Sequence, residues 1–192
     1  VSTDQIDHLL HMAVTACERY YPAFQLTCWG DQSPSSAMDV AIAEAYGRAY
    51  PKLNIKGDTM ALKTVSEKGL VLLGCGKMGS AMLQGWLSDG LPLTSVFVLD
   101  PFPSQWLQDL EIQGLHLNKS LPKSPAVCII AVKPQMMGEA LPSLKEIAQS
   151  DAVFLSIAAG TSIKSFQTVL GDTCKIVRAM PNTPAAIGQG IT

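Results

Sequence analysis

Short apolar runs alternate with stretches of helical spacing along the chain from residue 69 onward. The apolar runs cover residues 70–73, 95–99, 115–117 (a weak one), 126–132, 152–157 and 175–178. Alternation of this kind is typical of β-α-β units and a parallel sheet. Six such strands are enough for a complete doubly wound sheet, so the pattern predicts an α/β fold of the Rossmann type.

The first sixty residues have a different pattern. Helical spacing over 4–19, a short strand over 24–28 and a second helix to about residue 48 predict an α-β-α segment with no sheet of its own. Residues 51–66 are polar and broken by proline and glycine, which predicts a linker. We therefore expect three parts: a segment at 1–50, a linker at 51–66 and a Rossmann domain at 67–192. Because MALKTVSEKGLVLLG would make a natural protein start at Met60, residues 1–59 are expected to be the tail of a separate upstream protein or a fusion to one.

Composition narrows the classes of partner. The chain of 192 residues is 47% hydrophobic and 16% charged, so it can bury a substantial core. A net charge of −2 without a basic stripe argues against nucleic acid, and the longest apolar run is too short to span a membrane. The start has no secretory signal, and five scattered cysteines without a C-x-x-C motif predict reduced thiols in a cytoplasmic protein.

A glycine-rich loop follows the first strand of the Rossmann pattern. Gly74-Cys75-Gly76-Lys77-Met78-Gly79 has the G-x-G-x-x-G spacing, with a strand before it and a helix-like stretch over 80–89 after it. In this motif the first glycine permits the turn, the second lets the backbone approach a pyrophosphate, and the third permits close helix packing. Glycines also serve ordinary tight turns, so the motif alone leaves both interpretations open.

Other strand ends carry groups that suit a dinucleotide. Asp100 stands about 20 residues after the glycine loop, where a carboxylate would bind an adenosine ribose and repel a 2′-phosphate. It also precedes Pro101, where an aspartate would suit a turn. The sequence favours NADH over NADPH on this ground. Lys133 follows the fourth strand and is either a crevice residue or a solvated loop lysine.

The last two strand ends are also candidates. Ala158-Ala159-Gly160-Thr161 either leaves room for a ring or allows close packing of strand and helix. Residues 180–185, MPNTPA, place an amide and a hydroxyl between two prolines, which is more than a turn needs. His8 and His11 lie on one helical face, but without a third ligand nearby we expect surface histidines and no metal site.

Longer sequence segments resemble two known protein families. ACERYYPAFQ (16–25), WG (29–30) and SPSSAMDVAIAEAYGRA (33–49) resemble the C-terminal end of the YbjN family, small bacterial proteins of unsettled role. GCGKMGSAMLQGW (74–86), AVKPQ (131–135), LSIAAGTSI (155–163) and VRAMPNTPAAIGQG (177–190) resemble the N-terminal domain of pyrroline-5-carboxylate reductase. That family reduces 1-pyrroline-5-carboxylate to proline with NADPH or NADH.

The second resemblance implies a set of cofactor-binding residues. The pyrophosphate would lie on the loop from Gly74 to Gly79, with Asp100 by the adenosine ribose and Asn118 near the adenosine half. Asn182 and Thr183 would lie near the nicotinamide ring. The rest of the nicotinamide half would be lined by Ala131, Val132, Lys133, Pro134, Ala158, Ala159 and Gly160. Many family members have a serine or arginine near the end of the second strand, where this chain has Asp100, so NADP preference is in doubt.

The resemblance also implies what lies outside this sequence. In the family, a C-terminal helical domain supplies the substrate carboxylate site, the proposed proton donor and the dimer contacts, and the sequence given stops at Thr192. We therefore expect a monomer that binds the dinucleotide and turns over little or no substrate, with no catalytic residue assigned. The reaction requires neither a metal nor a covalent nucleophile, so Cys75 and Cys128 are expected to be buried thiols.

Two alternatives remain at this stage. A neighbouring dehydrogenase acting on a β-hydroxy acid or prephenate would have a different loop after the sixth strand. A dinucleotide-binding or interaction protein without catalysis would bind the cofactor but show no reductase activity.

Overall fold

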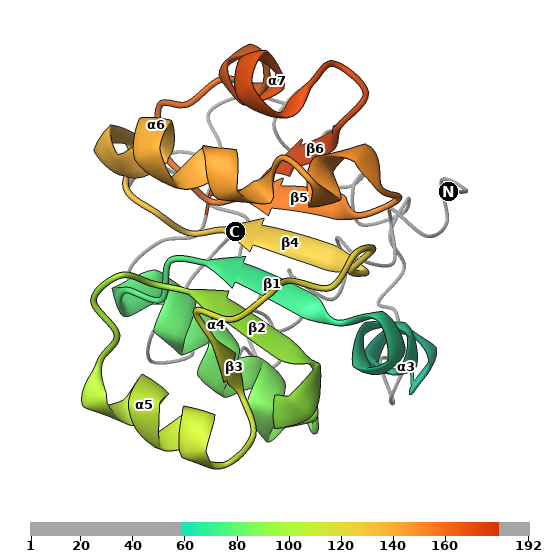
Figure 1. Cartoon of the computed structure of the whole chain (residues 1–192), viewed down its shortest axis with the longest axis vertical. Coiled ribbons are helices and arrows are strands. Elements are labelled where there is room, and N and C mark those ends of the chain that lie inside the picture. The colour runs from blue at the N-terminus through green and yellow to red at the C-terminus, as the bar shows by residue number, and fades with distance from the viewer. Residues whose placement is uncertain (1–58, 181–192) are drawn as a thin grey trace, which may run out of the picture. The chain divides into compact units, whose positions relative to one another are not determined.

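A six-stranded parallel sheet organises the part of the chain that the computed structural model describes, residues 59–180 (Figure 1). The strand order is β3-β2-β1-β4-β5-β6, and every neighbouring pair is parallel. The strands are β1 (Leu70–Leu73), β2 (Val96–Leu99), β3 (His116–Leu117), β4 (Val127–Ile130), β5 (Val153–Ser156) and β6 (Lys175–Arg178). This is the doubly wound order of a Rossmann fold, so the predicted fold class is confirmed.

Helices cover both faces of this sheet. The helices are α3 (Thr59–Lys68), α4 (Lys77–Ser88), α5 (Gln105–Ile112), α6 (Met137–Ala140) and α7 (Ile163–Leu170), with short 3₁₀ turns at Leu93–Ser95, Pro134–Met136, Leu141–Leu144 and Ile147–Gln149. Figure 1 shows α4 and α5 beside the half of the sheet that holds β1 to β3, and α6 and α7 beside the half that holds β4 to β6.

The core has two layers because neighbouring strand residues face opposite ways. In β1, Leu70 and Leu72 pack with the helices on one side, including Trp86 of α4. Val71 and Leu73 pack with the helices on the other side, including Phe166 of α7. Burial on both faces explains why the central strands β1 and β4 are unbroken apolar runs in the sequence.

The first helix of the domain corrects the predicted linker. Residues 59–66 were expected to be linker, but they lie in α3, and Val65 is fully buried against the core. Gly69 ends this helix with a φ of +95° and donates its N–H to the Val65 carbonyl at 2.8 Å. The proline and glycine that suggested a linker, Pro51 and Gly57, both precede the helix. The predicted segment at 1–50 lies outside the described residues.

The helix after the glycine loop begins earlier than predicted. It starts at Lys77 rather than Ser80, with Gly76 as its extended N-cap residue, and Ser80 donates to the Gly76 carbonyl at 2.8 Å. The last three residues of the motif therefore form the first turn of α4. None of the helices within residues 59–180 is long and apolar enough to cross a membrane.

Candidate cofactor site

The glycine loop leaves β1 through a turn that only glycine fits. Gly74 has a φ of +86°, and a Cβ there would lie 2.7 Å from Val132 Cγ1. Its N–H donates to the Leu99 carbonyl at the end of β2, at 2.8 Å. The turn is therefore fixed between the ends of β2 and β4, at the carboxyl edge of the sheet.

The second and third glycines of the loop meet different surroundings. A Cβ at Gly79 would lie 2.6 Å from the Gly74 carbonyl oxygen, so Gly79 permits the close approach of α4 to the loop. A Cβ at Gly76 would meet no atom within 4 Å. Packing therefore explains the glycine at 79 but not the one at 76, where a Cβ would extend into open space.

The start of α4 suits an anion. The N-cap residue Gly76 has no side chain that could cap the helix, and the first turn of α4 holds no acidic residue. The first N–H groups of a helix have no acceptor within the helix and form the positive end of its dipole. A twelve-residue helix that begins on an exposed glycine is the usual arrangement for a pyrophosphate.

The Asp100 carboxylate links two segments at the end of β2. Its Oδ1 accepts from the Phe102 N–H at 2.8 Å, which makes the aspartate turn, and its Oδ2 accepts from the Cys75 N–H at 2.7 Å. The turn interpretation of Asp100 is thus confirmed, and the same carboxylate borders the glycine loop. The contact with Cys75 was not anticipated, because it joins residues from two different strand ends.

Asn118 contacts the backbone of Asp100 with both ends of its amide. Its Oδ1 accepts from the Asp100 N–H at 2.9 Å, and its Nδ2 donates to the Asp100 carbonyl at 2.8 Å. Asn118 has a φ of +50°, a conformation that asparagine tolerates better than most residues. The structure therefore brings these two predicted site residues together.

The Cys75 side chain is a buried, neutral thiol. Burial, together with the nearby Asp100 charge as the smaller cause, raises the pKa of this thiol to about 12. Cys75, Cys128 and Cys174 are all free and buried, as expected for reduced thiols. A thiolate is the nucleophilic form of cysteine, so these groups are poor nucleophiles and the expectation of structural thiols at 75 and 128 agrees with their surroundings.

The segment after β4 runs along the glycine loop. Ala131 donates its N–H to the Leu73 carbonyl at 2.8 Å, and Val132 borders Gly74. Lys133 and Pro134 are exposed, and Pro134 opens the 3₁₀ turn toward α6. The end of β4 therefore lies beside the end of β1, with Lys133 directed to the surface of the protein.

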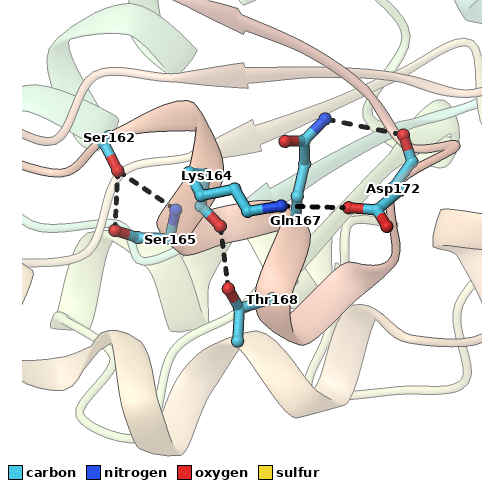
Figure 2. A network of polar contacts seen from close by, with 6 residues as sticks. All are labelled: Ser162, Lys164, Ser165, Gln167, Thr168 and Asp172. Atoms are coloured by element: carbon cyan, nitrogen blue, oxygen red, sulfur yellow. Dashed lines mark hydrogen bonds and ion pairs between the residues drawn. The ribbon is translucent and has the colours of Figure 1, made fainter.

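The segment after β5 has one buried residue followed by exposed ones. Ala158 is buried in the core layer of α6 and α7, whereas Ala159 and Gly160 are exposed. Gly160 has a φ of +70° and open space where a Cβ would be. Close packing thus accounts for Ala158 only. Helix α7 follows, and the Ser162 hydroxyl caps it by accepting the Ser165 N–H at 3.1 Å (Figure 2).

Strand β6 ends at Arg178, beside Ser156 at the end of β5, so the chain leaves the sheet at the same carboxyl edge. The remaining predicted residues fall outside the described part of the chain. Asn182 and Thr183 lie beyond residue 180, and His8 and His11 lie before residue 59. Between residues 59 and 180 no group of three or more histidine, cysteine, aspartate or glutamate side chains could hold a metal ion.

Comparison with known proteins agrees with this geometry. A family model described as NADP oxidoreductase, coenzyme F420-dependent, matches residues 69–160. Two curated relatives named pyrroline-5-carboxylate reductase are similar in sequence. The relative from Haemophilus influenzae is 33% identical over 129 residues, which are 66% of this chain and 48% of the relative. The relative from Escherichia coli is 34% identical over 130 residues, with the same coverage. The described domain is therefore similar to the matching part of these pyrroline-5-carboxylate reductases.

Solved structures of this type match the same region. Pyrroline carboxylate reductase from Plasmodium falciparum, solved with NADP bound, superposes with a TM-score of 0.54 at 28% identity, over 65% of this chain and 46% of that one. The pyrroline-5-carboxylate reductase of Coxiella burnetii gives a TM-score of 0.57 at 25% identity, over 64% of this chain and 47% of that one. The chain thus spans about half the length of the curated relatives it matches.

Proposed function

We propose that this chain is the cofactor-binding portion of an oxidoreductase that reduces 1-pyrroline-5-carboxylate to L-proline with a reduced nicotinamide dinucleotide. The observation that supports it most is Gly76, a bare and exposed N-cap residue that packing does not explain. The names of the relatives supply the substrate. A small-molecule partner and a homo-oligomer in the full-length enzyme are part of the same proposal.

The residues at the carboxyl edge would bind and orient the cofactor. The pyrophosphate would lie on the N–H groups from Gly76 onward, and the ribose hydroxyls would donate to Asp100. The nicotinamide half would lie along the segments 131–134 and 158–160, and Asn182 and Thr183 would complete it. When bound, the reduced cofactor supplies the hydride for a protonated imine carbon, so this domain contributes position and a site shielded from water.

We propose further that NADH is preferred over NADPH. The relative from Plasmodium falciparum was solved with NADP. In this chain the carboxylate of Asp100 stands beside the glycine loop, bonded to the Cys75 N–H. A 2′-phosphate placed there would meet a like charge and would have no ribose hydroxyl to donate. Replacing Asp100 by serine removes this charge and is expected to shift affinity toward NADPH.

The Gly76→Ala variant tests the site. Its affinity for NADH is compared with that of the unaltered chain by titration of the purified proteins, followed by nicotinamide fluorescence. The added methyl has open space in the protein, so the fold should keep its stability to within about 1 kcal/mol. It would stand between the helix start and the pyrophosphate, so we expect NADH to bind at least about tenfold more weakly. Gly138→Ala, which also adds a methyl in open space but on α6, serves as the matched control.

The outcomes separate the candidate functions. Equal NADH affinity in Gly76→Ala and the unaltered chain would reject the glycine loop as the pyrophosphate site. Saturable binding that Gly76→Ala weakens would establish it. Fusion of the chain to the remaining half of the Escherichia coli relative then tests the reaction by imine-dependent oxidation of NADH. Cofactor binding without that oxidation would favour a dinucleotide-binding protein that lacks reductase activity.

A further inference from the structure

The end of β3 is built around a side chain that replaces backbone pairing. The parallel pairing of β2 and β3 stops at Val98 and Leu117, and the Asn118 N–H still donates to the Val98 carbonyl at 2.8 Å. At Asn118 the backbone turns to a φ of +50° and can no longer follow β2. The Asn118 amide then bonds to the residue that follows β2: it accepts from the Asp100 N–H and donates to the Asp100 carbonyl.

This pairing determines where the Asp100 side chain begins. With both backbone polar groups of Asp100 held, its Cα has little freedom, and the two carboxylate oxygens reach the N–H groups of Cys75 and Phe102 at 2.7 and 2.8 Å. Hydrogen bonds that accept onto a charged oxygen are stronger than neutral ones. Four hydrogen bonds therefore hold Asp100, two between its backbone and Asn118 and two at its carboxylate.

A fixed carboxylate discriminates better than a mobile one. A side chain free to rotate could turn away from a 2′-phosphate and so reduce the repulsion. Turning Asp100 away would break its bonds to the Cys75 and Phe102 N–H groups. A carboxylate that is already in place also avoids the loss of side-chain freedom when the ribose binds.

We propose that Asn118 is a positioning residue for cofactor selectivity, which holds the backbone of Asp100 so that its carboxylate stays at the edge of the glycine loop and distinguishes NADH from NADPH. This inference rests on the proposed function. It assigns Asn118 a role through Asp100 rather than through contact with the adenosine, and it makes the ribose site a feature of the protein before any cofactor binds.

A double-mutant cycle tests this role in the full chain. Asn118→Gly removes the amide and keeps a residue that accepts a positive φ. Its ratio of NADH to NADPH affinity is expected to fall on the order of five- to tenfold, a coupling typical of residues in one hydrogen-bond network. In an Asp100→Ser background the same substitution should leave the ratio unchanged, because no carboxylate remains to be positioned. Thr168→Ala, which removes another side-chain bond to a backbone carbonyl, is the control away from the loop.

A second measurement needs no cofactor. In the unliganded chain, amide hydrogen exchange at Cys75 should be faster in Asn118→Gly, although Asn118 does not contact Cys75. Exchange at Asp100 would rise for any loss of the Asn118 acceptor, whereas exchange at Cys75 rises only if the carboxylate has become mobile. Unchanged exchange at Cys75 would overturn the positioning role even if both cofactors bind. Failure of the unaltered chain to bind either cofactor would instead reject the proposed function, while faster exchange at Cys75 would still support the positioning.

Discussion

At the scale of single residues, Asp100 shows how one side chain serves local and distant partners together. Its bond to the Phe102 N–H is a local turn contact, and its bond to the Cys75 N–H joins residues 25 positions apart. Local turn chemistry and a ribose site require the same short acidic side chain. Asp100 and Asn118 are both predictable from the sequence, but their contact with each other depends on the pairing of β2 with β3.

The thiol of Cys75 gives a prediction on pH. Its pKa rises from 9.0 to about 12 on folding, so the folded state holds this proton more tightly than the unfolded state. The stability that this raised pKa gives to the folded state is fully present below pH 9. It is lost as pH rises, so the free energy of unfolding falls between pH 9 and about pH 12. The raised pKa values of Cys128 and Cys174 add to the fall. Urea unfolding below and above pH 9 should show a smaller fall in the free energy of unfolding for Cys75→Ala than for the unaltered chain. An identical fall would contradict the raised pKa of Cys75.

At the scale of elements, α7 depends on its first residues. The Ser162 hydroxyl caps the helix and also lies 2.8 Å from the Ser165 hydroxyl (Figure 2). Farther along, the Lys164–Asp172 ion pair joins side chains that are 80% and 83% exposed, at 3.7 Å. Exposed ion pairs of this kind add little stability. The cap is therefore the polar contact that matters most for this helix.

Replacement of Ser162 by alanine tests the cap. Ser162→Ala leaves the first N–H groups of α7 without a side-chain acceptor, and we expect a loss of about 1 kcal/mol in the free energy of unfolding. Thr168→Ala in the same helix removes only a bond from its hydroxyl to the Lys164 carbonyl at 2.9 Å, and alanine is the better helix former. Chemical denaturation should therefore separate the two variants. Equal losses would show that the cap has no special role.

At the scale of the whole described domain, α3 belongs to the core. It was expected to be a linker, yet Val65 is fully buried in the same core layer as Trp86 of α4 and Val96 of β2. The layer on this side of the sheet therefore begins before the first strand. A domain boundary placed at residue 67 would cut through this helix.

The contribution of α3 can be measured with one substitution. Val65→Ala removes two buried methyl groups, and we expect the free energy of unfolding to fall by about 1–3 kcal/mol. Glu67→Ala, at an exposed position in the same helix, should change stability by less than about 0.5 kcal/mol. Thermal unfolding of both variants is the measurement. A Val65→Ala variant as stable as Glu67→Ala would show that α3 does not belong to the domain.

Parts of the fold and site were predictable because their signals are local. Each of the six strands was located to within two residues at either end. The signal was clearest in β1, β4 and β5, which are buried at every position and are largely apolar runs. The start of α4 was misplaced by three residues because Gly76, unlike a serine or aspartate, gives no clear N-cap signal. Helix α3 was missed because upstream proline and glycine obscured its short pattern.

The sequence by itself determined the parallel sheet, the position of the glycine loop and the residues at each strand end, because apolar periodicity and glycine spacing are properties of the chain. Only the tertiary structure decided that Val65 belongs to the core and that packing explains Gly79 but not Gly76. It also decided that Asn118 holds Asp100 and that Asp100 holds Cys75. Those contacts join residues from separate β-α units, and they exist only because parallel strands bring their carboxyl ends to one edge of the sheet.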